Sequence, residues 1–280
     1  MVAVNALSAF CLAAFVAVTS AVPEYDVGFE NSAYSVGETY DGPNQREDWD
    51  TLYGDPVNMS GDGAIISSDE ASSGSRSLRI RYPANEREIH QSPWELNGAR
   101  TYYLSYRLFF EEDFEFNGQG GSDGGKLPGL AGSASDDKYF ICSGGRPCGS
   151  GRGFSARLMW RTDGLGELYL YDVSNPNKYG DRIEFDSQRT FKKGAWQTIT
   201  QKVTLNRPGS EDGSIKVWLD GEVVVDVQGR KIVDGDEQVD TLYFSTFHGG
   251  SDEDWTPGQE QFAYFDDFVV SEDDGDVRFN

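Results

Sequence analysis

Histidine, methionine and cysteine are scarce in this chain. Its 280 residues include 2 histidines, 3 methionines and 3 cysteines, and the histidines, His90 and His248, lie far apart. Two such distant histidines make no metal-binding motif, and the acidic residues lack the spacing of an EF-hand calcium loop. We therefore expect no required cofactor. A structural Ca²⁺ at the acidic clusters has no support, because solvated carboxylates explain those clusters more simply.

Long apolar runs are also missing, except at the start of the chain. Ala6–Val18 is almost wholly apolar, and Thr19-Ser20-Ala21 follows it, which is the pattern of an export signal with a small-residue cleavage site. The run is short for a membrane span of ~20 residues, and no Lys or Arg precedes it. We predict that residues 1–21 are a signal peptide and that the protein is secreted, extracellular and without a membrane partner.

Basic residues are the minority charge. The chain has 24 Lys and Arg against 47 Asp and Glu, for a formal net charge of −23. This charge argues against nucleic acid and anionic membranes as partners. It also disfavours a polyanionic ligand, but at ~1 M ionic strength the screening length is only ~3 Å, so a local basic cleft could operate in a saline habitat. We expect residues 273–280 to be an acidic, solvated tail.

Helical periodicity and internal repeats are absent, and period-two alternation takes their place. Aromatics make up 13% of the residues and there are 33 glycines, which suits strands and tight turns. We predict an all-β fold, an antiparallel β-sandwich of the jelly-roll type with one concave sheet, as a single domain over residues 22–272. The expected strands are 77–82, 101–110, 154–161, 167–173, 196–205, 215–219, 222–227, 241–248 and 262–270.

The cysteines and one sequon agree with export. Cys11 would leave with the signal peptide, whereas Cys142 and Cys148 remain and are separated by Ser-Gly-Gly-Arg-Pro. In an oxidising compartment two such neighbours predict a disulfide that clips a small loop. Asn58-Met59-Ser60 is a sequon that predicts glycosylation of Asn58.

The segment from residue 118 to 153 interrupts the strand pattern. It contains Gly-Gly-Lys-Leu-Pro-Gly-Leu at 124–130, in which Lys126 stands alone among glycines and a proline. Glycine lets a backbone and a partner come close, and proline stiffens the chain. Lys126 is therefore either an ordinary turn lysine or the anchor for an anion. A long loop inside a compact domain is usually functional or disordered, and the predicted disulfide disfavours simple disorder. We therefore expect a flexible basic loop here.

A β-hairpin follows this segment. A three-residue turn at Thr162-Asp163-Gly164 would pair Arg157 with Tyr169 and Ser155 with Tyr171, whereas a four-residue turn would shift the register by one. The apolar pattern favours the first option, because Leu168 and Leu170 then face the core. One face of the hairpin would carry Ser155, Arg157, Met159, Arg161, Tyr169 and Tyr171.

Three motifs together resemble polysaccharide lyase family 14: Gly-Gly-Lys-Leu-Pro-Gly-Leu at 124–130, Ser-Ala-Arg at 155–157 and Tyr-Leu-Tyr at 169–171. That family contains alginate and glucuronan lyases with a β-jelly roll, and the family 20 glucuronan lyases are similar in fold. The resemblance covers the chain from about Tyr102 to Val270. It implies that the functional residues are Lys126, Ser155, Arg157, Tyr169 and Tyr171. The insert around Cys142–Cys148, and His248 in place of an aromatic residue, depart from the family pattern and could reshape the cleft.

The resemblance implies cleavage of a polyuronate by β-elimination. The enzyme removes the proton at C5 and expels the oxygen at C4, while a cation neutralises the neighbouring carboxylate. Arg157 and Lys126 are the candidates for that cation, and Tyr169 and Tyr171 for the base and the acid if nearby cations lower their pKa. Lys126 could instead be the base if burial lowers its own pKa. Ser155 would orient the sugar or a tyrosine, and the choice between alginate and glucuronan stays open.

Two alternatives come from other classes. The same sheet could belong to a non-catalytic carbohydrate-binding module with exposed aromatic side chains. A jelly-roll glycoside hydrolase needs two carboxylates across the scissile bond, and its Glu-x-Asp-x-x-Glu pattern is absent after Glu184. We add Arg161 and His248 as candidates for substrate binding, and Trp94 and Trp255 as rings that could stack on a sugar. The expected state is a monomer whose partner is an acidic polysaccharide.

Overall fold

The computed structural model describes residues 22–31, 33–49, 61–121, 124–134, 137, 140–149, 152–250 and 253–280. The predicted signal peptide and Asn58 lie outside these residues. Within the described ranges, no helix has the length and apolarity needed to cross a membrane. The same ranges contain no group of three or more His, Cys, Asp or Glu residues placed to hold a metal ion.

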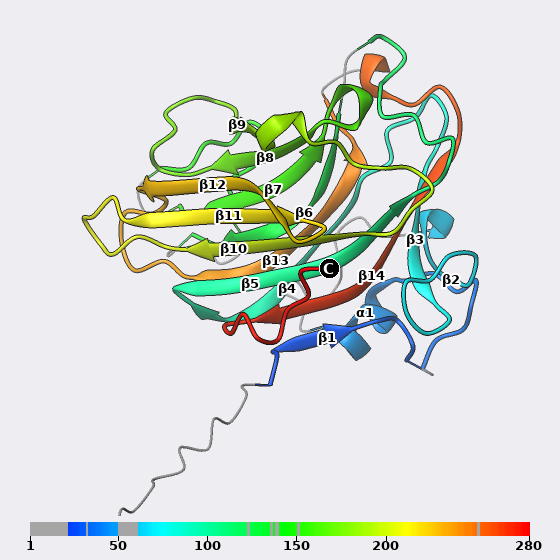
Figure 1. Cartoon of the computed structure of the whole chain (residues 1–280), viewed down its shortest axis with the longest axis horizontal. Helices are drawn as coiled ribbons and strands as arrows, with labels where there is room; N and C mark the ends of the chain where they lie inside the picture. The colour runs from blue at the N-terminus through cyan, green and yellow to red at the C-terminus, as the bar shows by residue number, and fades with distance from the viewer. Residues whose placement is uncertain are drawn as a thin grey trace, which may run out of the picture.

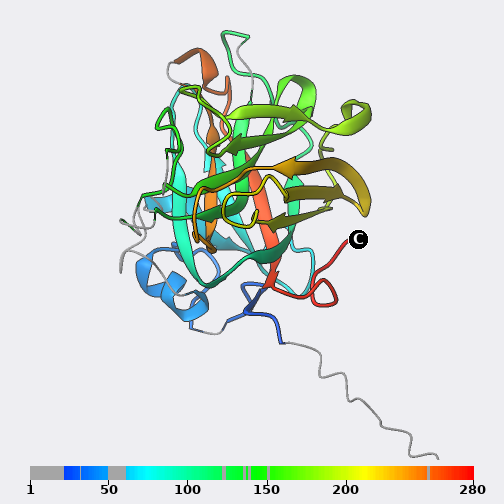
Figure 2. The same cartoon turned by 90° about the vertical axis from the view of Figure 1, so that its left-hand side faces the viewer.

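Two antiparallel sheets lie face to face (Figures 1 and 2). The larger has the strand order β12-β11-β10-β5-β14-β3-β2, with β1 beside β14, and the smaller has the order β4-β13-β6-β7-β8-β9. The larger sheet contains β1 (Tyr25–Val27), β2 (Ala64–Ser67), β3 (Ser77–Tyr82), β5 (Thr101–Phe110), β10 (Gln197–Thr204), β11 (Gly213–Leu219), β12 (Glu222–Arg230) and β14 (Gln261–Ser271). The smaller contains β4 (His90–Ala99), β6 (Gly125–Gly132), β7 (Phe154–Trp160), β8 (Gly166–Tyr171), β9 (Asp181–Glu184) and β13 (Val239–His248).

Among the described residues, helical structure is confined to short segments: α1 (Gly42–Asp48) and the 3₁₀ turns η1 (Gly61–Gly63), η2 (Thr162–Gly164), η3 (Asp186–Gln188) and η4 (Glu253–Trp255). The predicted all-β, antiparallel jelly-roll sandwich is therefore confirmed. The predicted Asp220-Gly221 hairpin is also present, because both residues have positive φ, 51° and 79°, between β11 and β12. That combination is the two-residue turn whose twist matches paired strands.

Alternating side chains fill the space between the two sheets. On β7 the inward residues are Phe154, Ala156, Leu158 and Trp160, and all four belong to the main hydrophobic core. The facing strand β5 contributes Leu104, Tyr106, Leu108 and Phe110 to the same cluster. Each large apolar side chain buried in this way stabilises the fold by about 1.5–3 kcal/mol. The opposite face of the smaller sheet is thereby left for other side chains.

The expected flexible loop around Lys126 is instead strand β6, between β13 and β7 in the middle of the smaller sheet. Its glycines allow close packing: a Cβ on Gly125 would lie 2.0 Å from the Trp160 ring, and one on Gly129 would lie 2.1 Å from the carbonyl oxygen of Ala156. Pro128, which has no N–H to donate, sits at a register shift between Leu127 and Gly129. A bulge of this kind is where a central strand tolerates proline.

The end of the chain packs on the outer face of the larger sheet and does not form the expected free tail. Val277 is 8% exposed and lies in a cluster with Tyr103 and Val269. The Arg278 N–H donates to Ser105 Oγ at 3.1 Å. The domain therefore continues past residue 272, although residues 272–275 are exposed.

Candidate active site

The β7–β8 hairpin has the register that the sequence favoured. Arg157 lies opposite Tyr169 and Ser155 lies opposite Tyr171. The Arg161 N–H donates to the Leu165 carbonyl at 2.8 Å, which closes the three-residue turn. Gly164 in this turn has a φ of +82°, a backbone region that glycine adopts without strain. The hairpin thus presents its polar residues on the face of the smaller sheet that looks away from the core.

Strand β6 places Lys126 on the same face. Lys126 lies opposite Met159 of β7 and opposite Phe247 of β13. Its Nζ is 2.9 Å from the Met159 Sδ and 4.5 Å from the centre of the Tyr169 ring. Lys126 thus stands on one continuous sheet surface with Arg157 and Tyr169.

This surface is the floor of a cleft of about 710 Å³. Six basic side chains line it, and none of the described residues that line it is an Asp or Glu. The basic residues are Arg87, Lys126, Arg146, Arg157, Arg161 and Arg182. In a chain of net charge −23, such a cleft concentrates positive potential where an acidic ligand would lie.

Arg157 is buried but has no carboxylate partner among the described residues. Its side chain is 2% exposed, its Nη1 donates to Ser245 Oγ at 3.0 Å, and its guanidinium lies 4.8 Å from the centre of the Tyr243 ring. Its Nε has no hydrogen-bond partner within the described part of the chain. A buried charge is costly unless it is paired, so the geometry is suited to an incoming anion.

Lys126 is a second buried basic group without a carboxylate partner in the described structure. It is 9% exposed. Burial lowers the pKa of Lys126 well below 10.5, and repulsion from Arg157 and Arg161 lowers it further. A lysine in such surroundings loses its proton far more readily than one in water. The condition under which we expected Lys126 to be a base is therefore met.

The two tyrosines lie side by side next to Lys126. Their hydroxyl oxygens are 3.5 Å apart and their rings meet edge to face at 5.4 Å. Burial, and then the hydrogen bond with Tyr171, raises the pKa of Tyr169 above 10.0. The condition that nearby cations lower the pKa is not met for Tyr169, because desolvation outweighs the attraction from Arg157. Tyr169 is therefore a protonated phenol at neutral pH.

Ser155 belongs to the site but does not line the cleft. It is fully buried, and its Oγ donates to the Cys142 carbonyl at 2.6 Å. Cys142 and Cys148 form a disulfide, as the sequence predicted. The loop that they close contributes Ser143, Gly144 and Arg146 to the cleft wall, and its Gly145 N–H donates to the Tyr171 hydroxyl at 3.1 Å. Ser155 therefore anchors this loop from below and does not face a ligand.

Arg161 lines the cleft, as expected, but is bound to a buried carboxylate. Its Nε and Nη2 donate to the two oxygens of Glu167 at 3.0 and 2.6 Å. The Arg182 Nε donates to the same carboxylate at 2.8 Å, and the Glu167 side chain is 0% exposed. One negative charge thus holds two guanidinium groups in fixed positions at one part of the cleft.

His248 lies in the interior and not at the cleft rim where the sequence suggested it. It is 2% exposed, packs against Tyr82 and Trp160, and has its Nε2 2.7 Å from the Gln261 Nε2. Burial lowers the pKa of His248 to about 4, so the ring is neutral. The neighbouring Phe247 faces the cleft in its place.

The two tryptophans proposed to stack on a sugar lie in different parts of the molecule. Trp94 is fully buried and stacks on Trp49 with ring centres 4.1 Å apart, so it is a core residue. Trp255 is partly exposed and lines the cleft. His90, expected to be structural, is 1% exposed with its Nε2 3.2 Å from the Arg81 carbonyl.

Sequence reasoning missed several residues of the cleft, namely Arg87, Arg146, Tyr179, Arg182, Tyr243 and Phe247. A signal existed for the last two. Leu242 and Phe244 are core residues, so period-two alternation along β13 turns Tyr243 and Phe247 outward and His248 inward. The three arginines come from separate loops and the edge strand β9, and no local pattern brings them together.

The fold and the site together define the class as a β-jelly-roll protein of the polysaccharide lyase type. The family model of polysaccharide lyase 14 matches residues 70–268, which is more than half of the chain. The chain therefore belongs to this family. The PL-14 alginate lyase from Aplysia kurodai is 25% identical, with a TM-score of 0.72 over 89% of this chain and 99% of that one.

Two other proteins show how far the similarity reaches. Exolysin of Paramecium bursaria Chlorella virus 1 is 25% identical over 221 residues, which are 69% of this chain but 32% of Exolysin. The chain thus spans about a third of that curated relative. The endo-β-1,4-glucuronan lyase from the fungus Trichoderma reesei has 14% identity and a TM-score of 0.52 over 82% of this chain and 95% of that one, a likeness of fold alone.

Proposed function

We propose that the protein is a lyase that cleaves a polyuronate, alginate or glucuronan, by β-elimination. The observation that carries the proposal is the pair of buried basic groups, Lys126 and Arg157, that have no carboxylate partner among the described residues and stand beside Tyr169 on the cleft floor. A polyuronate brings one carboxylate with each sugar unit. The family, and the alginate lyase from Aplysia kurodai, support the same chemistry.

Arg157 is the group that neutralises the uronate carboxylate. Its planar guanidinium can donate two parallel hydrogen bonds to a carboxylate, and its Nε has no partner within the described chain. Neutralising the carboxylate lets charge from the breaking C5–H bond move into it. Tyr243, 4.8 Å beneath the guanidinium, and Ser245 fix the orientation of the fork before the ligand arrives.

Lys126 is the general base and Tyr169 the general acid. The lowered pKa of Lys126 supplies a neutral amine that takes the C5 proton, and the raised pKa of Tyr169 keeps its hydroxyl proton for the departing O4. The C5–H and C4–O bonds break, a C4=C5 double bond forms, and the two new chain ends separate. General acid–base catalysis of this kind contributes about 10²–10⁴-fold in rate.

A product assay tests the proposal. Alginate, polymannuronate, polyguluronate and glucuronan are incubated separately with the protein, and the ultraviolet absorbance of the C4=C5 double bond is followed. We expect absorbance to rise with at least one of them. Binding without any absorbance change would favour the carbohydrate-binding module. New reducing ends without absorbance would indicate a hydrolase.

We also propose that the protein is exported, with residues 1–21 removed, and acts as a monomer outside the cell. The Cys142–Cys148 disulfide, which persists in oxidising compartments, supports export. Mass spectrometry of protein recovered from the medium of a eukaryotic host would give a mature chain that begins at Val22. Light scattering on the same material would give one chain per particle. A protein retained in the cytosol with its first residues intact would contradict the proposal.

A further inference from the structure

We propose that Tyr179 forms a sugar-stacking subsite beside the catalytic residues and that Arg230 is the positioning residue that holds it there. The proposal deepens the function proposed above, because the ligand would be another pyranose unit of the same polyuronate. It concerns the connection between β8 and β9, residues 172–180, which leads directly from Tyr171 to the cleft rim.

Tyr179 is unusual because it is an exposed aromatic residue that lines the cleft. It is 56% exposed, and no other aromatic residue in the described part of the chain reaches that class of exposure. It borders the cleft together with Tyr171 and Gly180. An aromatic ring offers a large apolar face at small entropic cost, and the C–H face of a pyranose ring is the complementary surface in a carbohydrate.

The backbone beneath Tyr179 is fixed by a chain of side-chain hydrogen bonds. The Asp172 Oδ1 accepts from the N–H groups of Ser174 and Asn175, each at 3.1 Å. The Asn175 Oδ1 accepts from the Asn177 N–H at 2.8 Å, and the Asn175 Nδ2 donates to the Tyr179 carbonyl at 2.8 Å. The side chain of Asp172 thus determines the path of the chain up to the aromatic residue.

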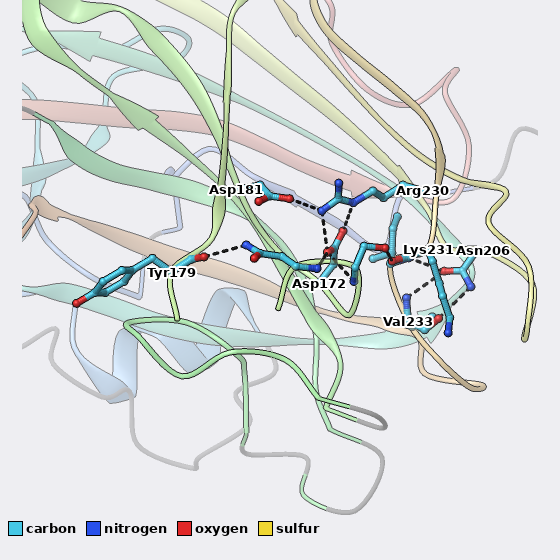
Figure 3. Close-up of polar contacts among 10 residues, drawn as sticks. Asp172, Tyr179, Asp181, Asn206, Arg230, Lys231 and Val233 are labelled. Carbon is cyan, nitrogen blue, oxygen red and sulfur yellow. Dashed lines mark hydrogen bonds and ion pairs between the residues drawn. The ribbon is translucent and has the colours of Figure 1, made fainter. Parts of the chain in front are cut away.

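Arg230 connects this chain of bonds to the other sheet. Its Nε and Nη2 donate to the two Asp172 oxygens at 2.6 and 3.0 Å, and its Nη2 also contacts Asp181, at the start of β9. The Asp172 side chain is fully buried and that of Arg230 is 25% exposed. Figure 3 shows the guanidinium between the two carboxylates, with the Tyr179 ring projecting away from the cluster. One arginine from β12 therefore holds both ends of the 172–180 connection.

A second tie makes the connection rigid. The Ser174 Oγ donates to the Lys231 carbonyl at 2.6 Å, and the Val173 N–H donates to the Ile232 carbonyl at 3.2 Å. The segment after β12 is itself fixed, because the Asn206 Oδ1 accepts from the N–H groups of Ile232 and Val233 at 2.7 and 3.0 Å (Figure 3). A ring carried on so constrained a connection is ordered before a ligand binds, which lowers the entropic cost of binding.

The charges around the ring indicate an acidic sugar. The Lys178 Nζ lies 5.3 Å from the centre of the Tyr179 ring, and Arg146 and Arg182 line the adjoining cleft. The disulfide loop comes close to both side chains, since a Cβ on Gly145 would lie 3.2 Å from the Lys178 Cε and 3.4 Å from the ring of Tyr179. The ring is thus flanked by basic groups, an arrangement suited to a pyranose that carries a carboxylate.

The first experiment compares Tyr179→Ala with Tyr179→Trp on an alginate tetrasaccharide and a glucuronan tetrasaccharide. For the sugar that is cleaved, we expect Tyr179→Ala to raise KM roughly three- to tenfold, the range that an aromatic contact supplies, with kcat changed less than twofold. Tyr179→Trp should keep KM within about twofold, because it keeps the ring face. Val223→Ala, a change at an exposed side chain outside the cleft, is the control. An unchanged KM in Tyr179→Ala would overturn the subsite.

The second experiment tests Arg230 through a double-mutant cycle. Arg230→Gln should raise KM about as much as Tyr179→Ala does, and the double variant should add little further, because both changes remove the same contact. Arg207→Gln, which breaks the exposed pair with Asp212, is the control and should leave KM unchanged. If Arg230→Gln does not fold, Arg230→Lys keeps the charge without the two-pronged contact and serves instead. Additive effects, or a loss confined to kcat, would contradict the positioning role.

Calorimetric titration separates this proposal from the proposed function. The same two tetrasaccharides are titrated into the wild type and into Tyr179→Ala. Binding that weakens with Tyr179→Ala, in a protein that cleaves neither sugar, would sustain the subsite and reject the lyase activity. If the protein cleaves a sugar but binds it equally well with and without Tyr179, the lyase activity stands and the subsite is rejected. Absence of binding to both sugars would overturn the subsite.

Discussion

The Lys126 amine lies 4.5 Å from the centre of the Tyr169 ring, inside a cleft that six basic side chains line and to which no described Asp or Glu contributes. This arrangement moves the two pKa values in opposite directions. Burial lowers the pKa of Lys126, and burial raises the pKa of Tyr169. The structure thereby places a base and an acid in contact. Over a broad pH range the base stays unprotonated and the acid stays protonated.

The pH dependence of kcat/KM should reflect this pair. A general base works only without its proton, so activity should fall as pH falls through the pKa of Lys126, at a pH well below 10.5. No loss should appear on the alkaline side below about pH 10, because the raised pKa keeps Tyr169 protonated there. A rate profile from pH 5 to pH 10.5 measures both. A fall in activity between pH 7 and pH 9 would contradict the assignment of Tyr169.

Replacing Arg157 should reduce catalysis more than stability. Loss of one charge-stabilising donor typically lowers kcat by about 10²–10³-fold, and we expect Arg157→Ala to fall in this range. Arg157→Lys should recover little, because an ammonium lacks the planar fork and the stacking on Tyr243. Steady-state kinetics and a melting temperature for each variant check this. A fully active Arg157→Lys would mean that charge alone suffices.

Removing the disulfide should affect both stability and activity. Joining Cys142 to Cys148 closes a short loop, and by loop entropy Cys142→Ser with Cys148→Ser should cost about 2 kcal/mol in the free energy of unfolding. The Gly145 N–H that donates to Tyr171 would lose its fixed position, so kcat/KM should fall roughly two- to tenfold, the worth of one hydrogen bond. Denaturant unfolding and kinetics on the double variant measure the two effects. Unchanged kinetics would show that the disulfide loop makes no contribution to catalysis.

His248 should influence stability and leave catalysis unchanged. Its folded pKa is about 4, against 6.5 for the unfolded group, so the unfolded chain takes up the proton first. The free energy of unfolding should therefore fall as pH drops from about 6.5 to about 4, by up to ~3 kcal/mol from this residue. In His248→Phe the free energy of unfolding should depend less on pH. The part of the pH dependence that comes from His90 should remain. Urea unfolding at pH 7 and pH 4.5 tests this. A changed KM in His248→Phe would instead show that His248 contributes to substrate binding.

The β7–β8 hairpin could be predicted because all the information it needs is local. Alternation from Phe154 to Arg161 defines two faces, and Gly164 supplies the positive φ that the three-residue turn needs. Strand β6 could not be predicted, because its glycines are explained by the Trp160 ring beside Gly125. Its proline is accommodated by Gln201 of the other sheet, whose side chain accepts from the Leu130 N–H and donates to the Ala156 carbonyl. These contacts join residues distant in sequence.

The same reason explains the remaining errors in the fold and site. Strand β4 contains Pro93 and Gly98, which indicate a turn when read without the neighbouring strand β13. The end of the chain is acidic enough to predict a free tail, yet Val277 and Phe279 cover apolar positions on β5 and β14. The basic wall of the cleft depends on Arg87, Arg146 and Arg182, which only the tertiary fold brings to one place.

Loss of the Lys126 amine tests the central claim most directly. The initial rate of C4=C5 absorbance on the preferred polyuronate is measured for the wild type, Lys126→Ala and the control Lys202→Ala, which alters a lysine over Tyr103 on the larger sheet. We predict that Lys126→Ala folds with an unchanged circular dichroism spectrum and loses at least ~10²-fold in kcat, while Lys202→Ala keeps the wild-type rate. A Lys126→Ala variant within about threefold of the wild-type kcat would contradict the proposed chemistry.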